Sequence, residues 1–175
     1  STLMKILSGV YVPDNGTILF EGQPVKLNSP KDAKSLKIET VYQDLALCDT
    51  LDVASNIFLG REPSFFAGFI DKKTLHKKAQ EELDRLGINI PSTYLPVKNL
   101  SGGQRQAIAI ARSITFNPKV LILDEPTAAL GVKEVNMVLE LIKSVKKKGV
   151  SVILITHRLQ DLFVVCDRIM VLYEG

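Results

Sequence analysis

The sequence predicts an α/β fold in which a mostly parallel β-sheet carries helices on both faces. Two continuous apolar runs, VLILD at 120–124 and SVILIT at 151–156, have the length and composition of strands buried on both faces. Segments with helical periodicity separate the strand patterns, and this alternation is typical of parallel sheets. The chain has 175 residues, of which 46% are apolar, and this is enough to form one domain with a hydrophobic core.

The expected elements alternate along the whole chain. The stretch SPKDAKSLK has Ser29 at a cap position and Pro30 at the first helical position. Asp71 begins an amphipathic helix that stops at Gly87. The expected helices span 3–10, 30–37, 52–59, 71–86, 102–116, 132–148 and 159–165. The expected strands span 17–20 and 24–27 (an antiparallel pair), 39–42, 120–124, 151–156 and 168–173, and 65–69 is expected to form a loop.

Composition argues against several classes of protein. The net charge of +3 is small, and the basic residues are mixed with nearly as many acids, unlike in a nucleic-acid-binding protein. Cys48 and Cys166 lack the spacing of metal ligands, and Cys166 lies in an apolar run typical of a core. No apolar run approaches the roughly 20 residues that span a bilayer.

Two acids follow the first buried strand. Asp124 and Glu125 come directly after VLIL, and ligands of parallel sheets bind beyond the carboxyl ends of the strands. Mg²⁺ prefers a few hard oxygen ligands together with water and phosphate. An acid at this position therefore suits Mg²⁺, and its neighbour suits the polarisation of a water molecule. The alternative is a solvated strand end without function.

The pentapeptide LSGGQ at 100–104 predicts an anion site at the start of a helix. Ser101 is a natural N-cap, and the two glycines allow backbone N–H groups to approach a ligand closely. The positive end of the helix dipole adds to this attraction. The alternative is an ordinary helix with a Ser cap after a Gly turn.

Two further polar residues each follow a predicted strand. Gln43 comes after VY, and its amide can bind Mg²⁺ or hold water without carrying charge. His157 comes after LIT, and its ring can donate a hydrogen bond to a phosphate oxygen. Each residue alone is weak evidence for a site, and a lone His after a strand more often has a structural role.

In their order along the chain, these four motifs resemble those of the ATP-binding cassette (ABC) ATPases, and the resemblance covers essentially the whole chain. Gln43 matches the Q-loop, 100–104 the signature, and 120–124 the Walker B strand. Glu125 matches the catalytic glutamate and His157 the switch histidine of the family.

The resemblance implies one ABC ATPase domain over 1–175. Its expected parts are a P-loop NTPase-type sheet, a small antiparallel β part and a helical signature subdomain at roughly 45–115. The opening STLMKILSGV is similar to the segment that comes after the glycine loop and its Lys in this family. We therefore expect that loop, the Lys and the first strands to precede residue 1, and further sequence to come after residue 175. Without several phosphate contacts, a chain of this extent should lose roughly 5 kcal/mol, more than a thousandfold in ATP affinity.

The resemblance also implies the ligands, ATP and Mg²⁺, and the role of each residue. Glu125 would be the general base for the attacking water, and His157 would steady the γ-phosphate. The expected catalytic residues are Glu125, His157 and Gln43; the expected metal ligands are Ser1, Gln43 and Asp124; the expected nucleotide-binding residues are Ser1, Thr2, Ser101, Gly102, Gly103 and Gln104. Of the last set, Ser101, Gly103 and Gln104 would reach the γ-phosphate of the ATP held by a second cassette.

One branch of the family is the most similar. The stretches NIFLGRE and DEPTAALGVKE look like those of bacterial importers of simple sugars such as ribose, galactose, xylose and fructose. The implied partners are a second cassette, transmembrane permease subunits and, indirectly, a sugar-binding protein, at the cytoplasmic face of the bacterial inner membrane and without nucleic acid. Phe65, Phe66 and Phe69 would form a docking patch for the permease, or else cover the helical subdomain.

The sequence departs from the family pattern at one position. Gly131 stands where the family often has Asp, in the loop that couples the two sites of a dimer. Two other functions remain open. One is an ABC ATPase acting on nucleic acid or ribosomes, and the other is a non-catalytic regulatory cassette. LSGGQ argues against a P-loop kinase or GTPase.

Overall fold

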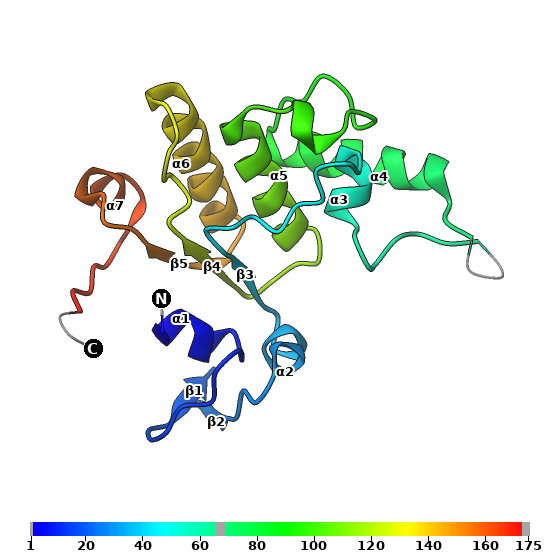
Figure 1. Ribbon diagram of the computed structural model, residues 1–175. Helices are drawn as coiled ribbons and strands as arrows, with labels where there is room; N and C mark the ends of the chain where they lie inside the picture. Colours follow the sequence, from blue (N-terminus) through cyan, green and yellow to red (C-terminus); the bar gives the residue numbers. More distant parts are fainter. Residues whose placement is uncertain (1, 66–68, 173–175) are drawn as a thin grey trace.

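The centre of the molecule is a three-stranded parallel sheet. The computed structural model describes residues 2–65 and 69–172, and the order of its central sheet is β3–β4–β5 (Figure 1). The strands are β3 (Ile38–Val41), β4 (Val120–Asp124) and β5 (Ser151–Ile155). In the register, Val41 lies opposite Leu123, and Asp124 lies opposite Ile155. The α/β class with a mainly parallel sheet is therefore confirmed.

Helices cover both faces of this sheet. On one face lie α5 (Gly102–Ile114) and α6 (Val132–Lys147), and their apolar sides join Leu121 and Leu123 in the larger core (Figure 1). On the other face, α1 (Thr2–Leu7) and α2 (Pro30–Ser35) join Ile38 and Ile122 in a smaller core. The side chains of β4 alternate between the two cores, as the pleat of a strand buried on both faces requires.

Two smaller parts complete the fold. Strands β1 (Ile18–Phe20) and β2 (Gln23–Val25) form the expected antiparallel pair around Gly22, whose φ of 78° lies in the region that glycine favours. Three helical elements pack beside α5: α3 (Val53–Ile57), α4 (Lys72–Leu86) and the 3₁₀ turn η2 (Val97–Asn99). Helix α4 begins and ends as predicted, because Asp71 accepts a hydrogen bond from the Thr74 N–H and Gly87 is left-handed at φ 69°.

Two local predictions are wrong. Residues 168–172 follow α7 (Leu159–Val165) without forming a strand, since apolar composition favours a strand but does not provide a neighbour to pair with. Strand β5, the outer strand of the described sheet, is not buried on both faces, because Ser151 and Ile153 lie on the same face and are exposed. Ser29 occupies the N-cap of α2 as predicted, and its hydroxyl donates to Asp32 Oδ2 (3.0 Å) instead of accepting a backbone N–H.

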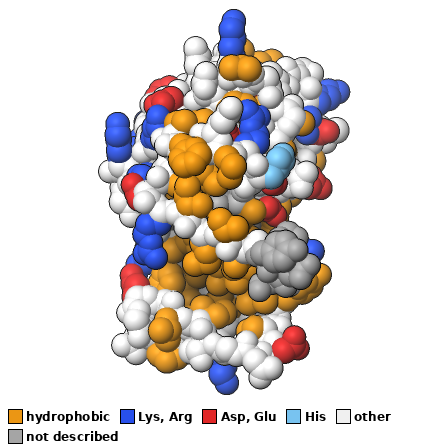
Figure 2. Space-filling model, turned by 90° about the vertical axis from the view of Figure 1, so that its left-hand side faces the viewer, with side chains coloured by type: hydrophobic (Ala, Val, Ile, Leu, Met, Phe, Trp, Pro, Cys, Tyr) orange, Lys and Arg blue, Asp and Glu red, His pale blue; other side chains and the backbone are white. Residues whose placement is uncertain are grey.

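The side of the molecule next to β5 carries much apolar surface. Hydrophobic side chains gather across the middle of this side (Figure 2). Those exposed on β5 and after α7 are Ile153, Ile169, Met170, Val171 and Leu172. No described helix combines the length and the hydropathy of a membrane span.

Candidate functional site

One edge of the central sheet brings four of the predicted site residues together. Because β3, β4 and β5 are parallel, their carboxyl ends meet at the same edge. Gln43 follows β3, Asp124 ends β4 and is followed by Glu125, and His157 follows β5. Residues far apart in the sequence thus come from neighbouring strands to one place.

Glu125 and His157 are in direct contact at this edge. Glu125 Oε1 lies 2.9 Å from His157 Nδ1 and accepts the backbone N–H of His157 at 3.1 Å. The Glu125 side chain is 19% exposed, whereas that of His157 is 77% exposed. Two contacts therefore fix one carboxylate oxygen, and the ring of the histidine extends from that oxygen toward solvent.

The second oxygen of this carboxylate is without a partner. Glu125 Oε2 is buried and makes no hydrogen bond within the described part of the chain. A buried carboxylate oxygen without a donor costs free energy, so a water molecule or another donor is expected to bind there. The backbone of Glu125 is also unusual, because its φ of 50° lies in the left-handed region. Such strain in a residue other than glycine is concentrated at functional sites.

The donor set of this edge fits Mg²⁺. Within residues 2–65 and 69–172, no three His, Cys, Asp or Glu side chains are grouped as an all-protein metal site requires. Mg²⁺ usually takes only one or two carboxylates and completes its octahedron with water and phosphate. Asp124 supplies one carboxylate and Gln43 an amide oxygen, which leaves the unpartnered Glu125 Oε2 free to bind a water molecule.

The LSGGQ segment forms the start of α5. Ser101 and Gln104 form a capping box, in which the Gln104 N–H donates to Ser101 Oγ (3.3 Å) and Gln104 Oε1 accepts the Ser101 N–H (3.0 Å). Ser101 and Gly102 are exposed, so this end of the helix faces outward. The contacts of the two glycines run to Leu130 and Glu134, on and before α6.

Glu134 is a residue that the sequence interpretation missed. Its Oε1 accepts the Gly103 N–H and its Oε2 accepts the Gly131 N–H, each at 3.2 Å. Gly103 fits closely against it, since a Cβ added there would lie 2.8 Å from Glu134 Cβ. The signal was present in the sequence, because a Glu three residues after the N-cap is half of a capping box. That signal explains the bond to Gly131 but not the one to Gly103.

The contacts of Glu134 predict how stability depends on pH. The Gly103 N–H, then the Ser101 side chain and the Gly131 N–H, lower the pKa of the Glu134 carboxyl. A depressed pKa stabilises the fold above the unfolded value of about 4.3, and this contribution is lost as pH falls through the folded pKa. We expect Glu134→Gln to lower the melting temperature at pH 7, and the difference from wild type to shrink below about pH 4. Thermal unfolding of both proteins at pH 7 and below about pH 4 measures this difference in melting temperature. A difference that does not change with pH would contradict the assignment.

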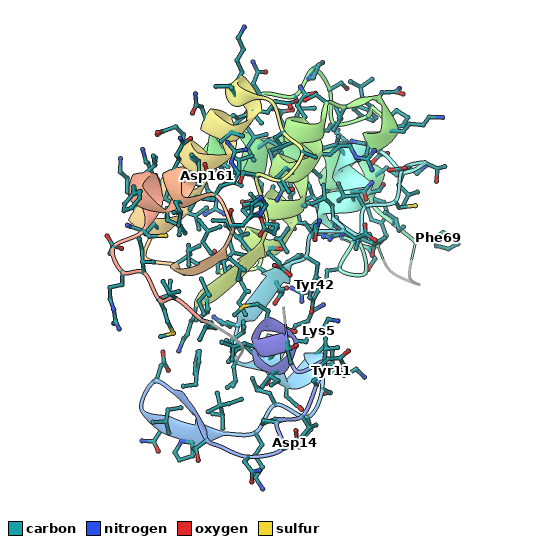
Figure 3. The ribbon with its side chains drawn as sticks, turned by 60° about the vertical axis from the view of Figure 1, so that its left-hand side comes forward. Lys5, Tyr11, Asp14, Tyr42, Phe69 and Asp161 are labelled. Carbon is teal, nitrogen blue, oxygen red and sulfur yellow. The ribbon has the colours of Figure 1, made fainter. Side chains whose placement is uncertain are left out.

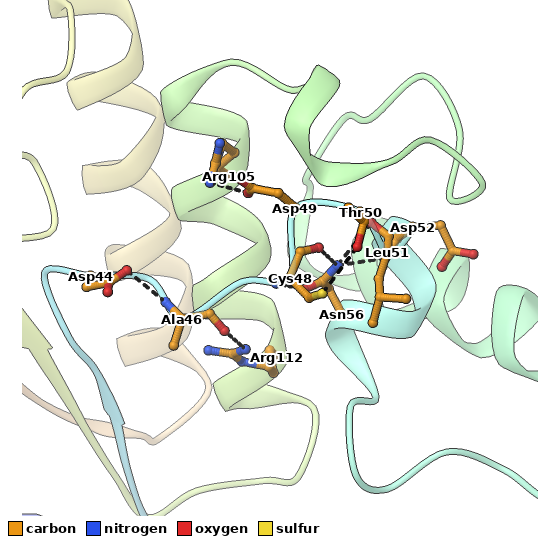
Figure 4. A network of polar contacts seen from close by, with 10 residues as sticks. All are labelled: Asp44, Ala46, Cys48, Asp49, Thr50, Leu51, Asp52, Asn56, Arg105 and Arg112. Carbon is orange, nitrogen blue, oxygen red and sulfur yellow. Dashed lines mark hydrogen bonds and ion pairs between the residues drawn. The ribbon is translucent and has the colours of Figure 1, made fainter.

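The loop after Gln43 is tied to the same helix, α5. Arg112 donates to the carbonyls of Leu45 and Ala46, each at 2.8 Å, and Arg105 pairs with Asp49 at 2.6 Å (Figure 4). Burial lowers the pKa of the Arg112 guanidinium, which stays charged because an Arg pKa lies far above neutral pH. The loop that carries Gln43 and the helix that carries LSGGQ are thus bound to one another.

Asn56 of α3 holds the next part of this loop. The Asn56 amide is fully buried, accepts the Cys48 N–H at 2.8 Å and donates to the carbonyls of Cys48, Leu51 and Asp52 (Figure 4). The side-chain amide of Asn56 therefore provides hydrogen-bond partners for several backbone groups of the turn 48–52. Cys48 itself is exposed, as a residue outside the core, and Cys166 is partly buried beside the larger core.

The two residues predicted at the N-terminus are placed only in part. Ser1 lies outside the described residues, and Thr2 is exposed at the first position of α1. The far end of α1 is joined to the end of β3, because the Tyr42 hydroxyl donates to Ser8 Oγ at 3.0 Å. Helix α1 therefore adjoins the strand that leads to Gln43.

Known proteins share this sequence and this fold. The ABC transporter family matches residues 1–128. A xylose/arabinose import ATP-binding protein from Sulfolobus acidocaldarius is 51% identical over all of the chain and 69% of its own length. A fructose import ATP-binding protein from Rhizobium meliloti is 46% identical over 97% of the chain and 68% of its own length. A ribose import ATP-binding protein from Rhodopirellula baltica is 45% identical over all of the chain, which spans only 34% of that relative.

Solved structures agree with the sequence matches. A subunit of the ABC transporter complex cbiONQ from Clostridium perfringens has a TM-score of 0.76 at 30% identity, over 95% of this chain and 65% of that one. A dimeric ATP-binding cassette bound to ADP and Pi has a TM-score of 0.71 at 26% identity, over 93% of this chain and 72% of that one. The match covers the sheet edge and the LSGGQ helix alike, and the chain belongs to the ABC transporter family, as one of its ATP-binding cassettes.

Proposed function

We propose that this chain is the ATP-hydrolysing cassette of an importer of simple sugars. The observation that carries the chemical part is the Glu125 carboxylate, whose Oε1 is fixed by His157 while its buried Oε2 lacks a partner. A fixed carboxylate with one open oxygen at the ligand-binding edge of a parallel sheet is the arrangement that a general base for water requires.

Some residues at the sheet edge would bind the metal ion, and others would act on the attacking water and the phosphate. Mg²⁺ would be held by Asp124 and Gln43, with the hydroxyl of Ser1, and would neutralise charge on the phosphates of ATP. Glu125 would take the proton of the attacking water, and His157 would steady the γ-phosphate. The His157–Glu125 contact gives this ring a second task, because it also holds Oε1 in place.

The outward-facing LSGGQ segment suits a second nucleotide. Ser101, Gly103 and Gln104 lie at a helix N-terminus, where the dipole favours a phosphate. A phosphate bound there would replace Glu134 Oε1 as the acceptor of the Gly103 N–H. Gly102 keeps the backbone accessible, and Thr2, at the start of α1, would contact the nucleotide bound by its own cassette. Two cassettes facing one another would thus share two ATP molecules.

The sugar specificity rests on the relatives, which are named for the import of xylose and arabinose, fructose and ribose. The partners would be permease subunits, which place the cassette at the cytoplasmic face of the cell membrane and connect it with an external sugar-binding protein. Residues 1–175 would form one domain, with the helical subdomain at roughly 45–115 as the docking side. Phe65 and Phe69 are exposed, and Phe69 points away from the body of the molecule (Figure 3), while Phe66 lies outside the described residues.

The test is ATP turnover and sugar uptake by the full-length natural protein, reconstituted in liposomes with its permease subunits. Uptake of one simple sugar that requires ATP hydrolysis is the expected result. Turnover stimulated by ribosomes or nucleic acid, without a permease, would instead indicate an ABC ATPase of the soluble type. ATP binding without any turnover would indicate a regulatory cassette.

A further inference from the structure

A buried polar contact lies beside the Glu125–His157 contact and is not explained by it. The Thr127 hydroxyl donates to Asp161 Oδ2 at 2.5 Å, and both residues are almost completely buried, at 1% and 3% exposure. Arg158 completes the group, with its Nε 3.5 Å from the same carboxylate oxygen and its Nη1 donating to the Thr127 carbonyl at 3.4 Å. Asp161, which is labelled in Figure 3, belongs to α7.

This buried group joins the same two loops as the Glu125–His157 contact does. Thr127 follows Glu125 after Pro126, which is buried and whose ring fixes its φ, so the position of Thr127 determines that of Glu125 closely. Arg158 follows His157 directly, and Asp161 is one helical turn further along. The loop after β4 and the loop after β5 are therefore connected twice, once at the reacting groups and once in the interior.

The buried contact between Thr127 and Asp161 can fix the positions of the two loops relative to one another. A buried carboxylate is costly unless it is paired and hydrogen-bonded, and apolar side chains of similar size often stabilise a fold as well. A fully bonded buried network fixes one arrangement of the chain, which apolar packing does less strictly. The segment that it fixes begins with the left-handed backbone of Glu125, and such a conformation persists only where its surroundings determine it.

We propose that Thr127 and Asp161 are positioning residues, which hold the Glu125 carboxylate and the His157 ring at the separation that hydrolysis requires. The proposal rests on the proposed function, in which these two residues act on water and phosphate. Thr127 and Asp161 act through Glu125 and His157 and have no contact with the nucleotide themselves. Their loss should therefore reduce the rate of the chemical step and leave the binding of ATP unchanged.

The test compares Thr127→Val with Thr93→Val in the full-length protein. Both substitutions keep the shape of the side chain and remove one buried hydroxyl bonded to another side chain, since Thr93 Oγ1 lies 3.1 Å from the buried His76 Nδ1 in the helical part. For Thr127→Val we expect kcat to fall about 10- to 100-fold with KM for ATP unchanged, because small misplacements of reacting groups cost rates of this size. Thr93→Val should lose as much thermal stability as Thr127→Val does, but should keep the wild-type kcat. Thr127→Ser, which restores the hydroxyl, should recover kcat.

The outcomes separate this proposal from the proposed function. A wild-type protein without ATP turnover would overturn the proposed function itself. Wild-type turnover that is lost in Glu125→Gln but unchanged in Thr127→Val would overturn only the positioning role. Equal losses of kcat in Thr127→Val and Thr93→Val, or no rescue by Thr127→Ser, would show that the hydroxyl contributes stability alone. Asp161→Asn, which keeps an acceptor for Thr127 but removes the charge facing Arg158, should lie between Thr127→Val and wild type in kcat.

Discussion

Replacing Glu125 by Gln is expected to lower the rate of ATP hydrolysis about 10²- to 10⁴-fold, the usual cost of losing a general base. The amide keeps the shape of the side chain and still offers one oxygen to the backbone N–H of His157. It no longer offers a basic oxygen at the position of Oε2. ATP should therefore bind and not be hydrolysed, so that a dimer holding intact ATP accumulates and is seen by size-exclusion chromatography.

A second Glu supplies the control for this experiment. Glu140 lies on α6, is exposed and pairs with Lys143 at 2.9 Å, so Glu140→Gln removes the same charge without touching the sheet edge. We expect wild-type turnover and no accumulation of dimer from it. Near-normal turnover in Glu125→Gln would assign the base to another group and leave the open carboxylate oxygen unexplained.

Replacing Gly103 by Ala is expected to be the most damaging small change in the LSGGQ segment. The added Cβ would lie 2.8 and 2.9 Å from Glu134 Cβ and Cγ, which are too near the α6 backbone to move aside alone. Overpacking of this kind usually costs 1–3 kcal/mol of stability. Since the start of α5 must shift, the Gly103 N–H also leaves the position proposed for a phosphate oxygen, and the loss of one such donor typically costs about 10²-fold in rate.

The neighbouring glycine provides a matched comparison. A Cβ at Gly102 would meet only the Cδ2 methyl of Leu130, at 3.1 Å, and that methyl is the flexible end of a side chain. Thermal unfolding should therefore show a clearly larger loss for Gly103→Ala than for Gly102→Ala. Equal losses of thermal stability in the two variants would mean that the contact between Gly103 and Glu134 does not restrict α5. The first turns of α5 and α6 could then move apart to accept the added methyl group.

Features that depend on pattern along the chain were predictable, and contacts between distant side chains were not. The parallel order of β4 and β5 followed from two apolar runs and the helix between them, and it placed Glu125 and His157 at one edge. Their direct contact depends on the turn geometry after each strand, and a left-handed residue other than glycine has no sequence signal. Glu134 and Asp161 were missed for a similar reason, because each bonds a group about 30 residues away.

The errors in the sheet have the same origin. The segment 168–172 has the composition of a strand, but whether an apolar run pairs is decided by the edge available to it and not by its own residues.

The left-handed backbone at Glu125 implies that thermal stability and activity place opposite demands on this position. A residue with a Cβ costs roughly 1–2 kcal/mol in this conformation, whereas glycine adopts it freely. Selection for thermal resistance alone would therefore favour glycine at this position, and selection for turnover would retain the carboxylate. The chain carries Glu at φ 50°, so it accepts this cost in stability where its proposed chemistry takes place.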